Sequence, residues 1–195
     1  NSWDLTGSID GTGTLTHQSG TLTITDGFFL DPGFVNNGAI IIDASGNLIG
    51  FSDVQNTGTV QIDNGTLRID GNGTNTGTFT VASGADLLFR NDYTFSSGGV
   101  SGLGTLEIDG SDFDLFGGTI GVQNVDLNSG ATLDVSGGGF SPTNLLLDVA
   151  TLTGSSDVTI SGLTTWDDGT MSGTGTTFAN GGIDFTGYAN RVINR

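Results

Sequence analysis

The residues of this chain that could take part in catalysis are few and nearly all of one kind. The 195 residues include no cysteine, one histidine (His17), and four cations, all of them arginine, against 21 acids of which only Glu107 is a glutamate. Without cysteine there is no thiol nucleophile, no disulfide and no Cys-based metal site. A single histidine cannot build a His-based metal site, and we expect His17 on the surface.

Paired carboxylates could support glycoside hydrolysis, which needs two acids that face each other about 5–10 Å apart. Asp167 and Asp168 form the only adjacent acidic pair, and neighbours on a strand point to opposite faces. Asp112 and Asp114 share one face, but their spacing is ordinary strand alternation. A lyase would need a basic residue as proton acceptor, and candidates are few. The acids and bases therefore predict that the chain is not an enzyme, and a polysaccharide-degrading β-helix is the disfavoured alternative.

Aspartates recur where strands are expected to end, and stacked turns would bring their carboxylates together (Asp10, Asp43, Asp63, Asp70 and Asp109). Hard cations with oxygen ligands would relieve that repulsion. The Gly-Gly-x-Gly-x-Asp repeat of calcium-binding rolls is absent. We expect no cofactor and an acidic surface that binds Ca²⁺ weakly and without specificity at most.

The net charge of −17 excludes two classes of partner. Nucleic acid needs clustered cations on the protein, and anionic membrane surfaces attract polybasic segments, neither of which occurs here. No apolar run approaches the ~20 residues of a membrane span. The sequence therefore predicts neither nucleic-acid binding nor membrane insertion.

Aromatic side chains are the remaining candidates for ligand contact, because exposed rings can bind host or matrix glycans. Tyr93 and Trp166 are the candidates along the chain, whereas Trp3 and Tyr188 lie near its ends, where capping of an open core is expected.

The elements that position these residues are predicted to be strands. The chain has 35 glycines, one methionine and no lysine, and its apolar residues alternate with Thr, Asp, Gln or Asn in short runs. The run NTGTVQI (56–62) recurs as NTGTFTV (75–81), and Gly46, Gly65 and Gly84 stand 19 residues apart. From residue 155 onward the register is loose, and residues 89–95 indicate a wider or irregular turn.

A repeat of 19–20 residues with alternating strands and Gly/Asn turns predicts an all-β, right-handed parallel β-helix of about 9–10 coils, forming one domain over residues 1–195. Stacking is expected to place Asn37, Asn56 and Asn75 in a buried ladder. The expected inward residues are Leu22, Ile24, Val60, Ile62, Phe79, Val81, Leu106 and Ile108.

The two open edges of such a rod are candidate contact surfaces. The terminal tail, residues 187–195, carries two of the four cations, Arg191 and Arg195, on an otherwise acidic rod. We expect the tail, with Trp3 and Tyr188, to make end-to-end contacts with another copy or with neighbouring repeat segments. Contacts of that kind generate filaments.

The runs GTLTI (20–24), GTLRIDG (65–71) and GTLEIDG (104–110) resemble the repeats of filamentous-haemagglutinin-type adhesins and autotransporter passenger domains over most of residues 5–186. The resemblance implies a right-handed parallel β-helix at the bacterial cell surface, serving as a stalk or adhesive rod. These families mostly lack catalytic residues, so none is carried over. The first residue is Asn and no leader pattern follows it, which fits a mature secreted protein or an excised segment. We therefore expect a non-enzymatic, extracellular structural or adhesive module, with a subunit of a self-assembling filament as the alternative.

Overall fold

The chain folds as a β-solenoid. The computed structural model describes residues 7–187 and 189–195, and within them it contains strands and turns but no helix. Strands pair in parallel from one coil to the next, and each coil has three faces. This confirms the prediction of a parallel β-helix.

The first face consists of short strands and of the first halves of four long strands. The short ones are β3 (Thr21–Ile24), β10 (Thr78–Val81), β17 (Gly139–Phe140), β20 (Val158–Ile160) and β23 (Thr177–Ala179), and the long ones are β6 (Ala39–Phe51), β8 (Thr59–Ile69), β13 (Gly99–Asp109) and β15 (Thr119–Asn128).

The second face contains the second halves of the four long strands. Its short strands are β1 (Gly7–Ile9), β4 (Phe28–Leu30), β11 (Asp86–Phe89), β18 (Asn144–Leu147), β21 (Thr164–Trp166) and β24 (Ile183–Phe185).

The third face is a separate sheet of ten strands, which agrees with the predicted number of coils. It is built from β2 (Thr14–His17), β5 (Gly33–Asn36), β7 (Val54–Asn56), β9 (Gly73–Asn75), β12 (Tyr93–Phe95), β14 (Asp112–Leu115), β16 (Thr132–Asp134), β19 (Ala150–Thr153), β22 (Gly169–Ser172) and β25 (Arg191–Asn194). Ten strands at a spacing of ~4.8 Å make a stack roughly 45 Å long.

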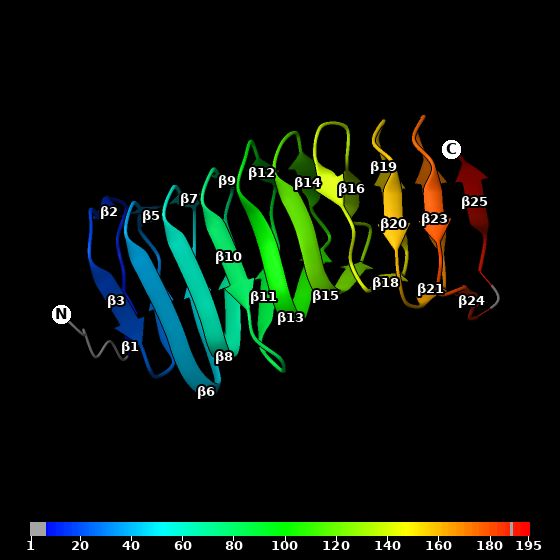
Figure 1. Ribbon diagram of the computed structural model, residues 1–195. Helices are drawn as coiled ribbons and strands as arrows, with labels where there is room; N and C mark the ends of the chain where they lie inside the picture. The colour runs from blue at the N-terminus through cyan, green and yellow to red at the C-terminus, as the bar shows by residue number, and fades with distance from the viewer. Residues whose placement is uncertain (1–6, 188) are drawn as a thin grey trace.

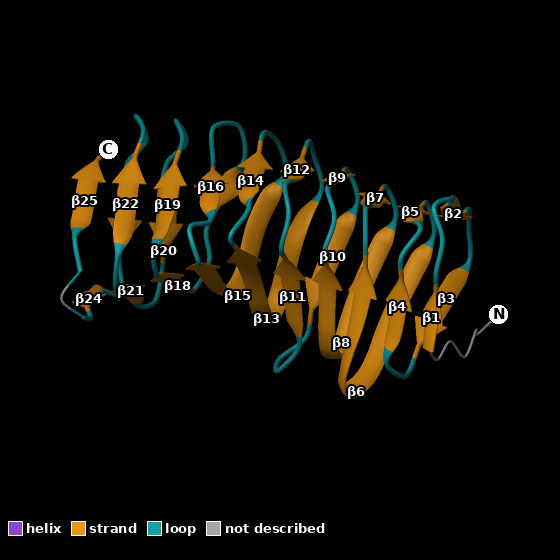
Figure 2. Cartoon of the chain, turned by 180° about the vertical axis from the view of Figure 1, so that it is seen from behind, coloured by secondary structure: helices purple, strands orange, loops and turns teal. Residues whose placement is uncertain are grey.

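The winding is right-handed, as predicted. In Figure 1 the coils advance from left to right and the near strands β20 and β23 run downward. Figure 2, from behind, shows β22 and β25 running upward on the opposite side. A strand that descends at the front and ascends at the back while the chain advances to the right describes a right-handed coil, the sense that parallel crossovers favour.

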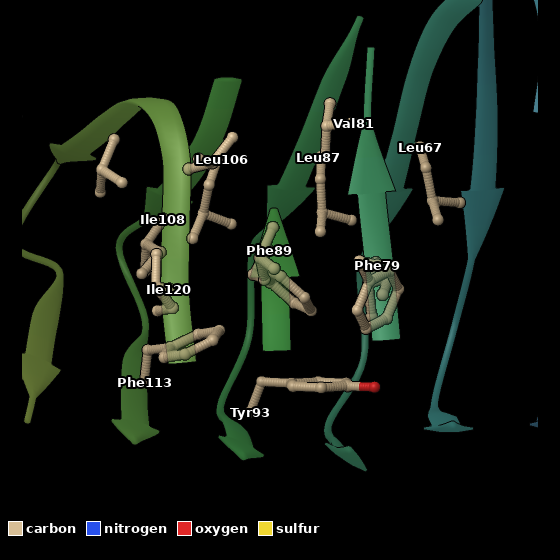
Figure 3. Packing of buried hydrophobic residues seen from close by; sticks show 14 of the residues in the cluster. Leu67, Phe79, Val81, Leu87, Phe89, Tyr93, Leu106, Ile108, Phe113 and Ile120 are labelled. Atoms are coloured by element: carbon tan, nitrogen blue, oxygen red, sulfur yellow. The ribbon is translucent and has the colours of Figure 1, made fainter. Parts of the chain in front are cut away.

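Alternation of side chains along each strand fills the space between the three faces with apolar groups. The inward residues predicted above are buried, except that Leu22 is only partly so. In the middle coils the core is aromatic: Phe89 lies 4.5 Å from Tyr93 and 5.2 Å from Phe113 between ring centroids, and Figure 3 shows these rings packed against Phe79 and the aliphatic side chains around it.

The irregular turn predicted at residues 89–95 is wrong. Phe89, Tyr93 and Phe95 all point into the core, and Tyr93 pairs in register with Gly73 below and Phe113 above. The segment is therefore an ordinary coil whose inward positions hold large rings.

The predicted loose register after residue 155 is also wrong, because Val158 pairs with Thr177 and Thr164 pairs with Ile183, each 19 residues later. The glycine alignment at 46, 65 and 84 is off by one residue. Ile49 pairs with Leu67 because the ladder shifts between Asp43 and Leu48.

A ladder of buried amides crosses the third face, and it contains Asn36 where Asn37 was expected. The Nδ2 group of Asn36 donates to Asn56 Oδ1 at 2.8 Å, and Asn56 Nδ2 donates to Asn75 Oδ1 at 2.8 Å. Asn75 Nδ2 completes the chain by donating to the carbonyl of Gly77 at 2.8 Å. Asn37 is one residue further along the strand direction, so its side chain is exposed.

His17 begins this ladder and is half-buried, which corrects its expected surface position. Its Nδ1 lies 2.9 Å from Asn36 Oδ1, an oxygen that also accepts the N–H of Gly38 at 3.2 Å. Because Asn36 presents an acceptor there, His17 Nδ1 carries the hydrogen and donates it.

Replacing the central amide tests the ladder. Asn56→Ala removes the acceptor of the 2.8 Å bond from Asn36 Nδ2, which keeps only a longer bond to the carbonyl of Thr59 at 3.4 Å, and it removes the donor to Asn75 Oδ1. We therefore expect a loss of about 2–4 kcal/mol in the free energy of unfolding, measured by urea denaturation. The control, Asn37→Ala, removes an exposed amide that accepts one solvent-exposed hydrogen bond from Thr57, and it should change stability by no more than about 1 kcal/mol. Equal effects of the two substitutions would contradict the ladder.

Candidate functional site

An open groove of about 520 Å³ lies on the third face, over β2, β5, β7, β9 and β12. Its lining is mainly polar and consists of Thr14, Gly33, Phe34, Val35, Asp53, Gln55, Asn72, Gly73, Thr74, Asp92 and Thr94.

The groove follows from the register of the third face. Outward positions stack in two parallel columns, so that Gln55 pairs with Thr74 and Thr74 with Thr94, while Thr14 pairs with Gly33 at the strand starts. Gly33 stands at an outward position and keeps the surface low there, whereas Gly73 stands at an inward position between Val54 and Tyr93. The groove is therefore an open stretch of the third face lined by outward polar side chains.

The two glycines that line the groove differ in the space around them. A methyl group on Gly73 would collide with the carbonyl of Val54 and with the ring of Tyr93, so this position has to stay bare. A Cβ on Gly33 would have only Thr14 Oγ1 at 3.7 Å and the Gly13 carbonyl at 3.9 Å nearby, which is ordinary contact. Gly33 thus leaves open space that a side chain could occupy.

Two carboxylates of the groove are oriented by the backbone. Asp53 Oδ1 accepts the N–H of Asn72 at 2.8 Å, and Asp92 Oδ1 accepts the N–H of Asp112 at 3.1 Å. Each carboxylate keeps its second oxygen for solvent or a ligand, since a carboxylate offers about four acceptor sites.

Acids also stack along the next coils of the same face. Asp114 pairs directly with Asp134. Partial burial raises the pKa of the Asp114 carboxyl, and the nearby charges of Asp134, Asp112 and Asp92 raise it further. On the second face, partial burial together with Glu107 and Asp86 likewise raises the pKa of Asp126.

These acids do not converge on a centre: across residues 7–187 and 189–195 there is no group of three His, Asp or Glu side chains that could hold a metal ion. Weak Ca²⁺ binding by the acidic surface stays a prediction. The Asp167–Asp168 pair serves its own turn, as expected, with Asp168 Oδ1 accepting the N–H of Gly169 at 2.6 Å.

The expectation that Tyr93 and Trp166 are exposed for glycan contact is wrong. Tyr93 is 1% exposed and Trp166 3%, because each stands at an inward position, paired with Phe113 and Leu147 respectively. The Tyr93 hydroxyl donates to the carbonyl of Thr74 at 3.2 Å, and burial raises the pKa of this phenol.

Sequence reasoning missed an exposed ring, that of Phe29. The edge of this ring rests on Gly50, and the Arg68 guanidinium lies 5.6 Å from its centroid, held by Asp70 at 2.7 Å. A smaller hollow of about 290 Å³ adjoins it on the second face. The signal in the sequence was the Phe28-Phe29 pair, since only one of two neighbours on a strand can point inward.

The C-terminal residues predicted to contact another copy are instead bound to their own chain. Residues 191–194 form β25, which pairs with β22. Arg191 Nε donates to the carbonyl of Trp166 at 2.7 Å, and Arg195 donates to the carbonyl of Ser156 at 2.8 Å and to that of Gly175 at 3.2 Å. Partial burial lowers the pKa of Arg195, a shift that Asp157 opposes.

Both arginines therefore hold the last coils of their own chain together. The other two residues predicted for end contacts, Trp3 and Tyr188, lie outside the described residues. No helix in the described part of the chain is long and apolar enough to cross a membrane.

The stacked acids give a pH-dependent prediction. The pKa of Asp114 is raised in the folded state, so the protonated carboxyl stabilises the fold relative to the charged one. This stabilisation is fully present below the ordinary carboxyl pKa and is lost as the pH rises through the raised pKa. Asp114→Asn should therefore raise the melting temperature at pH 7 by about 1–3 °C and leave it unchanged at pH 3. Asp184, exposed and paired with the neutral Thr165, is the control, and Asp184→Asn should show no such difference. An equal shift at both pH values would contradict the prediction.

The chain was also compared with protein-family models, with curated proteins and with solved structures, and none of the three comparisons finds a match.

Proposed function

We propose that this chain is a non-enzymatic structural or adhesive module, a rigid acidic rod that works outside the cell at a bacterial surface. The observation that carries the proposal is the unbroken stack: the third face alone aligns ten parallel strands, and a continuous apolar core follows them from coil to coil. Such a stack resists bending, because every strand between the two ends is hydrogen-bonded on both sides.

The side walls of the rod suit an adhesive role. Short turns leave the outward columns of the three faces open to solvent, and the charge of −17 keeps a strand-rich surface soluble. Catalysis would need a cleft in which acids or bases face each other, whereas the stacked pair Asp114 and Asp134 lies side by side on one flat sheet.

Surface display tests this proposal. The chain, fused to a membrane anchor on a non-adherent bacterium, should raise the retention of cells on polysaccharide-coated or matrix-coated plates at least about threefold over the anchor alone. Small-angle scattering on the free chain should give a rod of roughly 45 Å. Retention equal to that of the anchor alone would count against the adhesive role, and a compact or expanded particle against the rigid rod.

A second candidate, end-to-end assembly into a filament, is favoured by the last described coil. Ile183, Phe185 and Ile193 occupy inward positions there, yet they are 40%, 60% and 67% exposed. The outer edges of their strands, β24 and β25, pair with no other strand of the described chain. An exposed core with free strand edges is a template for another coil.

Sedimentation velocity distinguishes this candidate. End-to-end assembly predicts a mass that grows with protein concentration, and Phe185→Asp should abolish that growth by placing a charge in the contact. Phe116→Asp, at an exposed ring on a turn between faces, is the control and should leave the growth intact. A monomer at all concentrations would overturn the candidate.

A further inference from the structure

The groove on the third face gathers polar side chains that the protein itself does not use. The amides of Gln55 and Asn72 and the hydroxyls of Thr14, Thr74 and Thr94 form no hydrogen bond with any residue that the structure describes. Elsewhere on the rod such groups pair across coils, as Asn64 does with Asp43 at 2.6 Å and Asn144 with Asn124 at 3.0 Å. The groove is therefore a concentration of free donors and acceptors.

These groups repeat along the axis of the rod. The column that contains Gln55, Thr74 and Thr94 presents one polar group per coil, at a spacing of ~4.8 Å. Beside it, Asp53, Asn72 and Asp92 form a second polar column at the strand starts. Over the three coils of β7, β9 and β12, a ligand that lies along the groove thus meets hydrogen-bonding groups once per coil, whereas on the β5 coil it meets Gly33 and Val35.

We propose that this groove binds an extended, neutral polysaccharide chain that runs parallel to the axis of the solenoid. The inference rests on the adhesive part of the proposed function and names its ligand class. Sugar hydroxyls are both donors and acceptors, which matches a lining of carboxylate oxygens, amides and hydroxyls. One sugar unit is similar in length to one coil, so successive units meet successive coils.

Charge decides between neutral and anionic chains. Asp53 and Asp92 are both exposed in the groove, and the basic residue nearest to it in the sequence, Arg90, points its guanidinium toward Asp109 at 3.6 Å. An anionic glycan would be repelled by the two carboxylates without a cation to offset them. A neutral chain donates its hydroxyl hydrogens to the same oxygens.

Backbone pairing argues against an extended peptide as the occupant. A peptide gains affinity by adding to a free strand edge. Of the five strands under the groove, β5, β7, β9 and β12 are each hydrogen-bonded to a neighbour on both sides, and only β2, at the end of the described sheet, pairs on one side. Recognition therefore has to come from the outward side chains.

Gly33 provides a direct test, because the space above it is open and its backbone is free of positive φ. Gly33→Leu fills the groove with a side chain that a strand accommodates, and the fold should be kept. Gly121 is an exposed glycine on the outward side of the first face with equally open space. Gly121→Leu adds the same side chain away from the groove and is the matched control.

The experiment is isothermal titration of the full chain with cellohexaose, mannohexaose, xylohexaose and chitohexaose, beside hexagalacturonate, a chitosan hexamer and an unrelated six-residue peptide. We expect at least one neutral hexasaccharide to bind, Gly33→Leu to weaken that binding at least about tenfold, and Gly121→Leu to leave it unchanged. The double variant Gln55→Ala/Asn72→Ala should weaken it similarly without adding bulk, which keeps the test valid if Gly33→Leu fails to fold.

Several outcomes would overturn the inference: no neutral hexasaccharide binds at millimolar concentration, only the charged oligosaccharides or the peptide bind, or Gly33→Leu and Gly121→Leu have equal effects. If displayed cells still adhere while the groove binds no glycan, only this inference fails. If the groove binds glycan but cells do not adhere, the adhesive role fails and the site remains.

Discussion

The constraint on which this molecule depends is the in-register stacking of parallel strands. Paired residues lie directly on one another at the distance of one strand spacing, and most pairs are 19 or 20 positions apart in the sequence. The contribution of a side chain to stability therefore depends first on its contact with the paired residue of the neighbouring coil. Apolar residues on apolar residues make the core, amides on amides make a hydrogen-bonded ladder, and the carboxylates of Asp114 and Asp134 repel each other.

The same constraint determines how a site can arise. In many folds a pocket is formed by loops that converge, but here the turns are short and the walls are flat. Relief on the surface comes from differences in size within one column or between two adjacent columns. The surface of the groove is low at Gly33, an outward glycine that pairs with Thr14, and its chemistry is a repetition of amides, hydroxyls and carboxylates with no single reactive centre.

The sequence predicted the architecture well, because alternation and period are local signals that repeat along the chain. The inward residues from Ile24 to Ile108 were found from alternation alone. Register was harder, since a shift such as that between Asp43 and Leu48 changes which residues pair without changing the pattern. An uncertainty of one residue in the register is the reason why the ladder contains Asn36 and not the predicted Asn37.

The candidate site could not be predicted for a related reason. Tyr93 and Trp166 are buried because their strand positions face inward, and the inward side of a strand cannot be told from the residue type of an aromatic ring alone. The groove can be located only when the pairing of strands and turns is known. From the sequence alone, Gly33 cannot be distinguished from the other glycines among the 35 of the chain.

The amide ladder has a consequence for how the rod comes apart. In a simple solenoid each coil is held only by its two neighbours, so it can fray one coil at a time from an end. From His17 to Asn75 the side chains form one chain of hydrogen bonds that all point the same way. Breaking any of these bonds leaves one donor and one acceptor without their partner in the ladder. We therefore expect these coils to open together and not one at a time.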